Sequence, residues 1–259
     1  MALILNPWPF DHRMLGSWIG GVKQIIAGDV VLGGAGAADV WSGGGIVDWT
    51  PSGVVTLEST SGNDLPAGTG IGSVLLTGSD AGSGQVAVVV YPLNGTTPVI
   101  TTEQFKGPLL ELSGVTAGSG GDEYATSLAA GDITAKIGGV VAGAIRQGEN
   151  AATFAALRSP FMPGGGIATS VLLDLVVSVA PATAGKGLVK VQLYSKSGSA
   201  PPLPVGPTLA FETESASSAA VSLPTTLASE GILFARAVTT KAVQVFVSIS
   251  AVAYGPLTP

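Results

Sequence analysis

The segment LNGTTPVITT, residues 93–102, separates two apolar stretches that are typical of β-strands. The stretch before it, residues 85–91, is QVAVVVY, and the stretch after it runs from Phe105 to Leu112. Asn-Gly between such stretches is typical of a β-hairpin, because a tight primed turn needs positive φ angles that both residues accept. The segment therefore predicts antiparallel sheet, with a hairpin turn at Asn94-Gly95.

Strand-like stretches continue along the chain from Val54 onward. They recur at spacings of about 8–15 residues and are separated by clusters of Gly, Ser, Asn, Asp and Pro. Alternation of apolar and polar residues is clearest in residues 167–179, 187–195 and 242–254, where each strand has one apolar face suited to a sandwich core. We predict an all-β protein with two consecutive β-sandwich or jelly-roll-like domains, preceded by an irregular aromatic N-terminal arm.

The expected domain boundaries follow from composition. Residues 1–50 hold all four tryptophans, the one histidine and two closely spaced prolines, and we expect them to be an arm or docking segment. Residues 51–145 are the expected first β domain and residues 146–259 the second. Tryptophan favours interfaces, so the arm either grips a neighbouring subunit or packs back on its own body. In the docking interpretation the contact residues are Trp8, Phe10, Trp18, Trp41 and Trp49. On this view, removing residues 1–50 leaves the β body folded.

The composition limits the function classes. Charged residues make up 11% of the 259 residues, against about 25% in ordinary soluble domains. A surface so poor in charge is either solvated by Ser, Thr and Gly or buried against other subunits, and we expect both. Lys and Arg are scattered singly and the net charge is −6, which argues against a nucleic-acid partner. No apolar run reaches the roughly 18 residues of a membrane span, so we expect no membrane association. The start of the chain lacks the basic region of a secretory signal.

Several motifs together are similar to a known family. They are VVTL at 54–57, ND at 63–64, AGTG at 67–70, VLLTGSD at 74–80, LNGTTPV at 93–99 and AGDI at 130–133. This set resembles a module of tailed-bacteriophage virion proteins, and GENAATF at 148–154 with MPGG at 162–165 resembles the β-sandwich that often follows it. The family's VPAG loop is replaced here by FMPG at 161–164. The resemblance extends over about residues 51–255, and residues 1–50 have no counterpart in it.

The resemblance implies a non-enzymatic structural component of a bacteriophage particle, with no cofactor and no catalytic residues. The form we expect decorates or cements the capsid as a homotrimer. Its partners are then the major capsid protein and copies of itself, and its place is the capsid surface of a virion assembled in the host cytoplasm. The alternative is a tail, neck or fibre protein with a host-glycan-binding tip.

Candidate sites for chemistry are sparse. Asp11-His12-Arg13 is the one place where a base adjoins a carboxylate, and a structural histidine is the expectation there. Gly34-Ala35-Gly36 follows an apolar stretch, but the third glycine of a dinucleotide fingerprint is missing. We therefore expect neither catalysis nor nucleotide binding.

Acidic residues offer oxygen ligands that suit calcium, without the spacing of a calcium loop. The two possible groups are Asp122-Glu123 with Asp132, and Asn63-Asp64 with Asp80. We expect no bound metal. Glu212 and Glu214 share one side of a strand, which suits a solvated, protected edge. A lectin-like role for the loop SGSAPPLP, residues 197–204, is the sharper alternative for the second domain, although that half of the chain has no tryptophan.

Overall fold

Antiparallel β-strands make up the regular structure of the protein. The computed structural model describes residues 18–47, 52–83, 86–116, 125–152, 156–158, 169–197, 200–227 and 231–256. Within these ranges every named element is a strand and no helix occurs. The predicted all-β fold class is therefore confirmed.

The strands form two compact units. Unit 1 comprises Met1–Val40 and Ala155–Pro259, and unit 2 comprises Trp41–Phe154. The strands of unit 1 are β1 (Trp18–Leu32), β2 (Gly36–Asp39), β9 (Ala156–Arg158), β10 (Thr169–Pro181), β11 (Leu188–Ser197), β12 (Leu203–Glu212), β13 (Ser217–Leu227), β14 (Gly231–Thr239) and β15 (Val243–Pro256). Those of unit 2 are β3 (Gly53–Ser59), β4 (Ser73–Asp80), β5 (Val86–Pro92), β6 (Val99–Val115), β7 (Ile133–Ile137) and β8 (Val140–Ile145).

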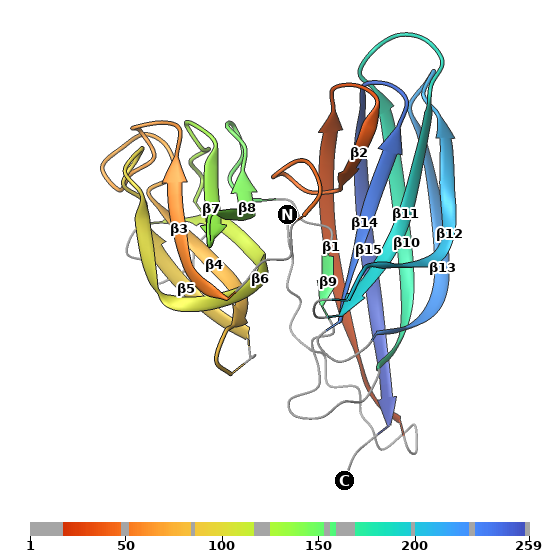
Figure 1. The fold of residues 1–259 in the computed structure, drawn as a ribbon, viewed down its shortest axis with the longest axis horizontal. Coiled ribbons are helices and arrows are strands. Elements are labelled where there is room, and N and C mark those ends of the chain that lie inside the picture. The colour runs from red at the N-terminus through yellow and green to blue at the C-terminus, as the bar shows by residue number, and fades with distance from the viewer. Residues whose placement is uncertain are drawn as a thin grey trace. The chain divides into compact units, whose positions relative to one another are not determined.

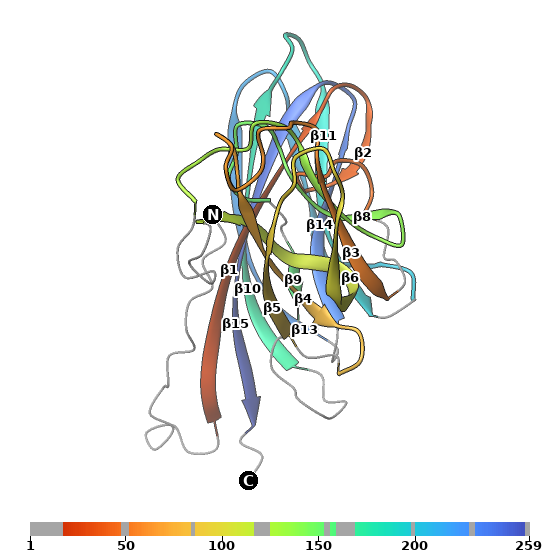
Figure 2. The ribbon, with the colours of Figure 1, turned by 90° about the vertical axis from the view of Figure 1, so that its left-hand side faces the viewer.

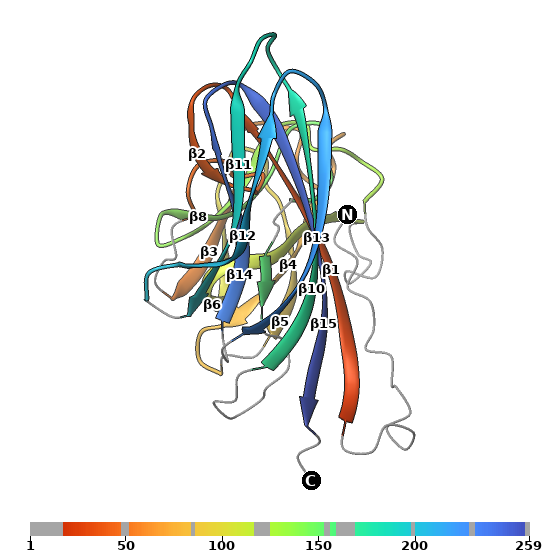
Figure 3. The same cartoon turned by 90° about the vertical axis from the view of Figure 1, so that its right-hand side faces the viewer.

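Unit 1 is a sandwich of two sheets (Figures 1 and 3). One sheet has the order β1-β15-β10-β13, and the other has the order β12-β11-β14-β2, with β9 also paired to β14. The alternating apolar residues predicted from the sequence face inward. The buried set includes Leu175, Val177, Val179, Val189, Val191, Leu193, Val243, Val245, Val247 and Ile249. Burial of such rows stabilises the sandwich by about 25 cal/mol per Å² of apolar surface.

The N-terminal region differs from the irregular arm expected over residues 1–50. Trp18–Leu32 form strand β1, which pairs with β15 along its length (Figure 2). Gly36–Asp39 form β2, which pairs with β14. The backbone therefore supplies an edge strand to each sheet of the sandwich, because long-range pairing outweighs the Gly-rich, aromatic character of this region. Residues 1–17 lie outside the described residues.

The domain boundaries also differ from the expected consecutive order. Strands β2 and β9 lie on the same edge of β14, where Asp39 is opposite Arg236 and Ala156 is opposite Phe234. The Val40 N–H donates to the Ala235 carbonyl oxygen at 2.9 Å, which fills the position between them. β9 thus continues the line of β2, and unit 2 is inserted into a single edge strand of unit 1.

Unit 2 is one curved six-stranded sheet with the order β5-β4-β6-β3-β7-β8. The long strand β6 pairs with β3 in its first part and with β4 in its second, and it bends between them (Figure 1). Its concave side holds a separate apolar core around Phe105 and Leu112. Gly78 is needed beside this core, because a Cβ there would lie 2.7 Å from the Phe105 ring.

The hairpin predicted at Asn94-Gly95 is wrong, although the turn itself exists. Strand β4 pairs with β5 on one side and with β6 on the other, so the two strands that flank the turn are not partners. Gly95 has the expected positive φ, 58°, but its N–H donates to the Asp64 carbonyl oxygen at 2.8 Å. The turn is therefore fixed to the loop after β3, and the chain crosses from one side of β4 to the other.

No helix in the described part of the chain combines the length and apolar character that crossing a membrane would require.

Candidate functional site

The acidic residues considered as metal ligands are used by the fold. The Asp64 carboxylate is fully buried and accepts four hydrogen bonds. Its donors are the Ser59 hydroxyl at 2.6 Å and the backbone N–H groups of Ile71, Ala130 and Gly131 at 2.9, 2.9 and 3.0 Å. A carboxylate whose lone pairs are filled in this way ties the end of β3 and the β3–β4 loop to the β6–β7 loop, and it leaves little capacity for a cation.

The remaining candidate ligands are dispersed. The Asp80 carboxylate accepts bonds from Gly82 and Ser83 in its own turn, and the Ser83 backbone N–H is the largest cause of its lowered pKa. Asp132 accepts from the Gln147 N–H at 2.8 Å. Asp122 and Glu123 lie outside the described residues. Within the described ranges, no three His, Cys, Asp or Glu side chains come together as a metal site.

The glycine-rich segment leads to Asp39, which forms an ion pair. Asp39 is fully buried and pairs in bidentate fashion with Arg236, with Nε–Oδ1 at 2.6 Å and Nη2–Oδ2 at 3.2 Å. The Arg236 guanidinium also lies over the rings of Tyr194 and Phe234, at 5.2 and 5.6 Å from their centroids. This arrangement fastens β2 to β14 through a bidentate, charge-assisted pair.

The other sequence candidates fall in several places. Asp11, His12 and Arg13 lie outside the described residues. Glu212 and Glu214 are both exposed near the end of β12, and Glu214 lies 3.7 Å from Lys186. The loop at residues 197–204 is described only in part, and Leu203 in it is exposed.

The aromatic docking residues are placed only in part. Trp8, Phe10 and Trp49 lie outside the described residues, and for Trp18 the backbone alone is described, opposite Pro256. Trp41 is buried, and its indole N–H donates to the Gly44 carbonyl oxygen at 2.9 Å. Its ring packs so closely on Gly43 that a Cβ there would lie 2.5 Å away. Trp41 therefore supports a turn of unit 2, and docking by the other four residues stays a prediction.

Mostly uncharged side chains, among those described, cover the outer side of the β1-β15-β10-β13 sheet. We call it the outer face. Its described side chains are Val31, Asp174, Val176, Ser178, Ala180, Ser218, Ala220, Ser222, Gln244, Phe246 and Ser248. Val176 and Phe246 are 40% and 42% exposed. Asp174 is the one ionisable group among these described side chains, and it accepts a hydrogen bond from Ser222. The outer face thus offers mainly apolar and uncharged polar groups on a hydrogen-bonded sheet.

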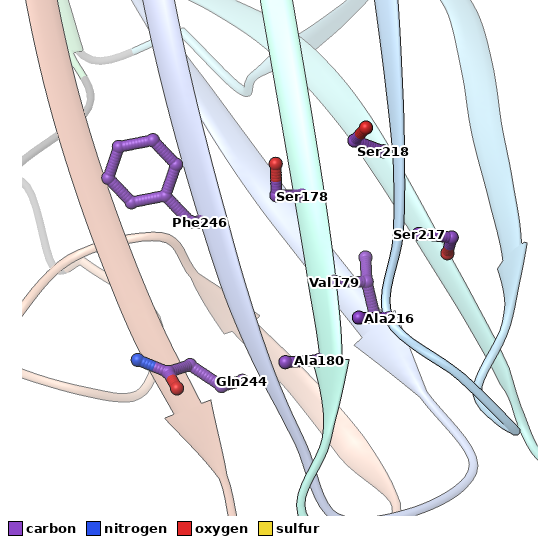
Figure 4. A pocket seen from close by; sticks show the side chains of 8 residues that line it. All are labelled: Ser178, Val179, Ala180, Ala216, Ser217, Ser218, Gln244 and Phe246. Atoms are coloured by element: carbon purple, nitrogen blue, oxygen red, sulfur yellow. The ribbon is translucent and has the colours of Figure 1, made fainter.

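A shallow hollow of about 530 Å³ lies on this surface. Phe246 and Gln244 line it from β15, Ser178 from β10 and Ser218 from β13 (Figure 4). The Ser217 hydroxyl is buried beside it and finds no hydrogen-bond partner among the described residues. The hollow can therefore accept an apolar surface together with neutral hydrogen-bonding groups, and nothing in its described lining activates a nucleophile or transfers a proton.

Sequence reasoning identified the core side of these strands and overlooked the outer side. The signal was present, because alternation in β15 places Gln244, Phe246 and Ser248 opposite the buried valines. Phe246 therefore places an aromatic side chain on the outer face, at a position that its neighbours in the alternation fill with polar residues.

No protein-family model and no curated protein matches the chain. The chain is similar to solved structures of infectious bursal disease virus. For a crystal structure of the viral particle, the sequence identity is 12% and the TM-score 0.24, over 94% of this chain and 75% of that one. For the structure of the Gx strain, the sequence identity is 11% and the TM-score 0.24, over 100% of this chain and 80% of that one. For the VP2 subviral particle, the sequence identity is 11% and the TM-score 0.23, over 98% of this chain and 80% of that one.

Proposed function

We propose that the protein is a non-enzymatic structural component of a bacteriophage particle, which decorates or cements the capsid as a homotrimer. The observation that carries the proposal is the outer face, whose described side chains are apolar or uncharged except for Asp174. The buried carboxylates Asp64 and Asp39 are engaged in holding the fold. Among the described residues, the outer face is therefore the surface that we propose contacts a partner.

The composition supports the same role. Seventeen acidic and eleven basic residues are few for a chain of 259, so its neutral surface suits burial against other subunits. Such burial contributes about 25 cal/mol per Å² of apolar area and is insensitive to salt, which suits a protein that reinforces a shell. The partners are the major capsid protein and further copies of this chain. Trp8, Phe10, Trp18 and Trp49 are the proposed anchors to the shell.

The test compares shells of the major capsid protein with and without this protein. We expect the bound protein to raise the temperature at which shells open, measured by release of an encapsidated dye. The double variant Val176→Lys/Phe246→Lys should no longer bind the shell, because docking of the outer face would then remove two charges from water. Val238→Lys is the matched control, since Val238 is 48% exposed on the other sheet of unit 1. Unchanged shell opening with the protein bound would refute the cementing role.

A second candidate function is a tail, neck or fibre protein that binds host glycan. The hollow favours it, because an aromatic ring beside amide and hydroxyl groups suits a neutral sugar. Saturable binding of host polysaccharide, lost in Phe246→Ala and Gln244→Ala and retained in Val238→Ala, would support this role. Absence of binding to polysaccharide from every susceptible host would refute it.

A further inference from the structure

Strand β5 is the outermost strand at one end of the sheet of unit 2. Among the described residues it pairs with β4 alone, from Ser73 opposite Pro92 to Ser79 opposite Val86, without a register shift. An edge strand presents a row of unpaired backbone N–H and C=O groups with which another strand can pair. β5 is therefore a regular template for strand addition.

The free backbone groups belong to alternate residues of β5. The Leu93 N–H donates to the Gly72 carbonyl oxygen at 2.9 Å, which directs Leu93 toward β4. Because successive residues of a strand point their backbone groups to opposite sides, Val86, Val88 and Val90 direct theirs to the free edge. Pro92, which lacks an N–H, also falls on the free side, where proline is tolerated.

The side chains of β5 leave its edge unprotected. Ala87, Val89 and Tyr91 pack on the core of unit 2, whereas Val88 is 60% exposed. The strand contains no charged residue, and its proline is at its last position. Proteins usually protect a sheet edge with lysine, proline or a bulge, so an exposed apolar edge indicates a partner strand.

Edge strand β12 of unit 1 shows the contrast. It carries Pro204 and Pro207, and between them Gly206 has a positive φ of 67°. Its ladder with β11 is shifted between Val191 and Leu193. These features oppose strand addition at β12. β5 has no positive-φ glycine and no register shift, and its proline is at its last position.

We propose that β5 pairs antiparallel with β5 of a second copy, about a two-fold axis at Val89. In this register Val88 lies opposite the partner's Val90, and Ala87 lies opposite the partner's Tyr91. Core-facing residues then meet core-facing residues, and exposed residues meet exposed ones. No like charges face each other, so the edge is complementary to itself. The contact joins two six-stranded sheets into one.

This contact goes beyond the proposed role in the particle. A trimer has a three-fold axis and no two-fold axis, so β5 pairing connects two separate trimers or, without a trimer, two single chains. It doubles the mass of the assembly where two single chains pair, or where all three β5 strands of one trimer pair with those of one second trimer in D3 symmetry. Its test reads mass in solution and is independent of shell binding.

The test uses two charge patterns on the full-length chain, with molar mass measured by light scattering. V88K/V90K places introduced lysines opposite each other across the axis and should halve the molar mass relative to the wild type. V88K/V90E places each introduced lysine opposite an introduced glutamate of the partner and should restore the wild-type mass. The contrast between the two variants reports both the strand and the register.

Ile100→Lys is the control for added charge, because Ile100 is 62% exposed on β6 of the same unit. It should keep the wild-type mass. Val88→Pro is a second variant that removes an edge-facing N–H and should also halve the mass. Matching thermal midpoints show that the variants are folded. Equal masses for the wild type and V88K/V90K, or halved masses in both double variants, would overturn the proposal.

Discussion

Unit 1 and unit 2 use the same antiparallel strands and build their cores in different ways. In unit 1 two sheets face each other, and alternate aliphatic residues of every long strand form the core. In unit 2 one curved sheet needs a second wall, and loops held by the buried Asp64 carboxylate supply part of it. The stability of unit 1 is therefore spread over many aliphatic side chains, whereas that of unit 2 depends strongly on the hydrogen bonds of the Asp64 carboxylate.

Removing strand β1 should have the largest effect and be confined to unit 1. Deletion of residues 1–32 exposes the long edge of β15, whose backbone groups pair with β1 from Trp18 to Leu32. We expect unit 1 to lose its cooperative thermal transition in calorimetry while unit 2 keeps its own. Deletion of residues 1–17, which leaves β1 intact, is the control and should preserve both transitions. Two transitions after the longer deletion would show that β1 is dispensable.

Removing unit 2 is the reciprocal experiment. Deletion of residues 41–155 joins Val40 to Ala156 and makes β2 and β9 one continuous strand along β14, opposite Arg236, Ala235 and Phe234. We expect the transition of unit 2 to disappear and that of unit 1 to stay within a few degrees. An unfolded product in circular dichroism would mean that the sandwich needs the insertion to form.

The two units also differ in how much of their structure the sequence predicts. Alternation in β10, β11 and β15 placed the core residues of unit 1 correctly, because each strand has one buried and one outer face. In unit 2 the pattern fails at β4, where seven consecutive residues are buried and neither face alternates. Strand stretches were recognisable there, but their neighbours were not.

The insertion and the Asn94-Gly95 crossing depend on contacts between distant residues. Asp39 pairs with Arg236, and Gly95 donates to Asp64, and neither partner is indicated by local sequence. A positive-φ glycine predicts a turn but not which strands that turn connects. Alternation in β15 places Phe246 on the outer face, so this position is predictable from the sequence. The hollow beside it depends on the register of β10, β13 and β15, which local sequence does not indicate.

Substitution of Asp64 should destabilise unit 2 strongly. Asp64→Ala leaves the Ser59 hydroxyl and three N–H groups, two of them buried, without an acceptor, which costs roughly 3–5 kcal/mol. Urea unfolding followed by circular dichroism should show a lower midpoint for unit 2 alone. Asp132→Ala is the matched control, because Asp132 is exposed and accepts a single described backbone bond, so its loss costs about 1 kcal/mol. Equal losses for the two variants would contradict the bracing role of Asp64.

Acid should produce the smallest effect, again in unit 2. The Tyr91 hydroxyl bond is the largest cause that lowers the pKa of Glu103 below its ordinary value of 4.5, and Ser83 lowers that of Asp80 below 3.8. A carboxyl with a lowered pKa stabilises the folded state above its ordinary pKa, and that contribution is lost as pH falls through the folded value. The urea midpoint of unit 2 should therefore begin to fall as the pH drops below about 5 and should continue to fall as it passes below the ordinary pKa values of the two groups. Both groups are partly accessible to solvent, so the decrease is modest. Glu103→Gln combined with Asp80→Asn should flatten it, and an equal acid dependence in this variant would assign the effect to other groups.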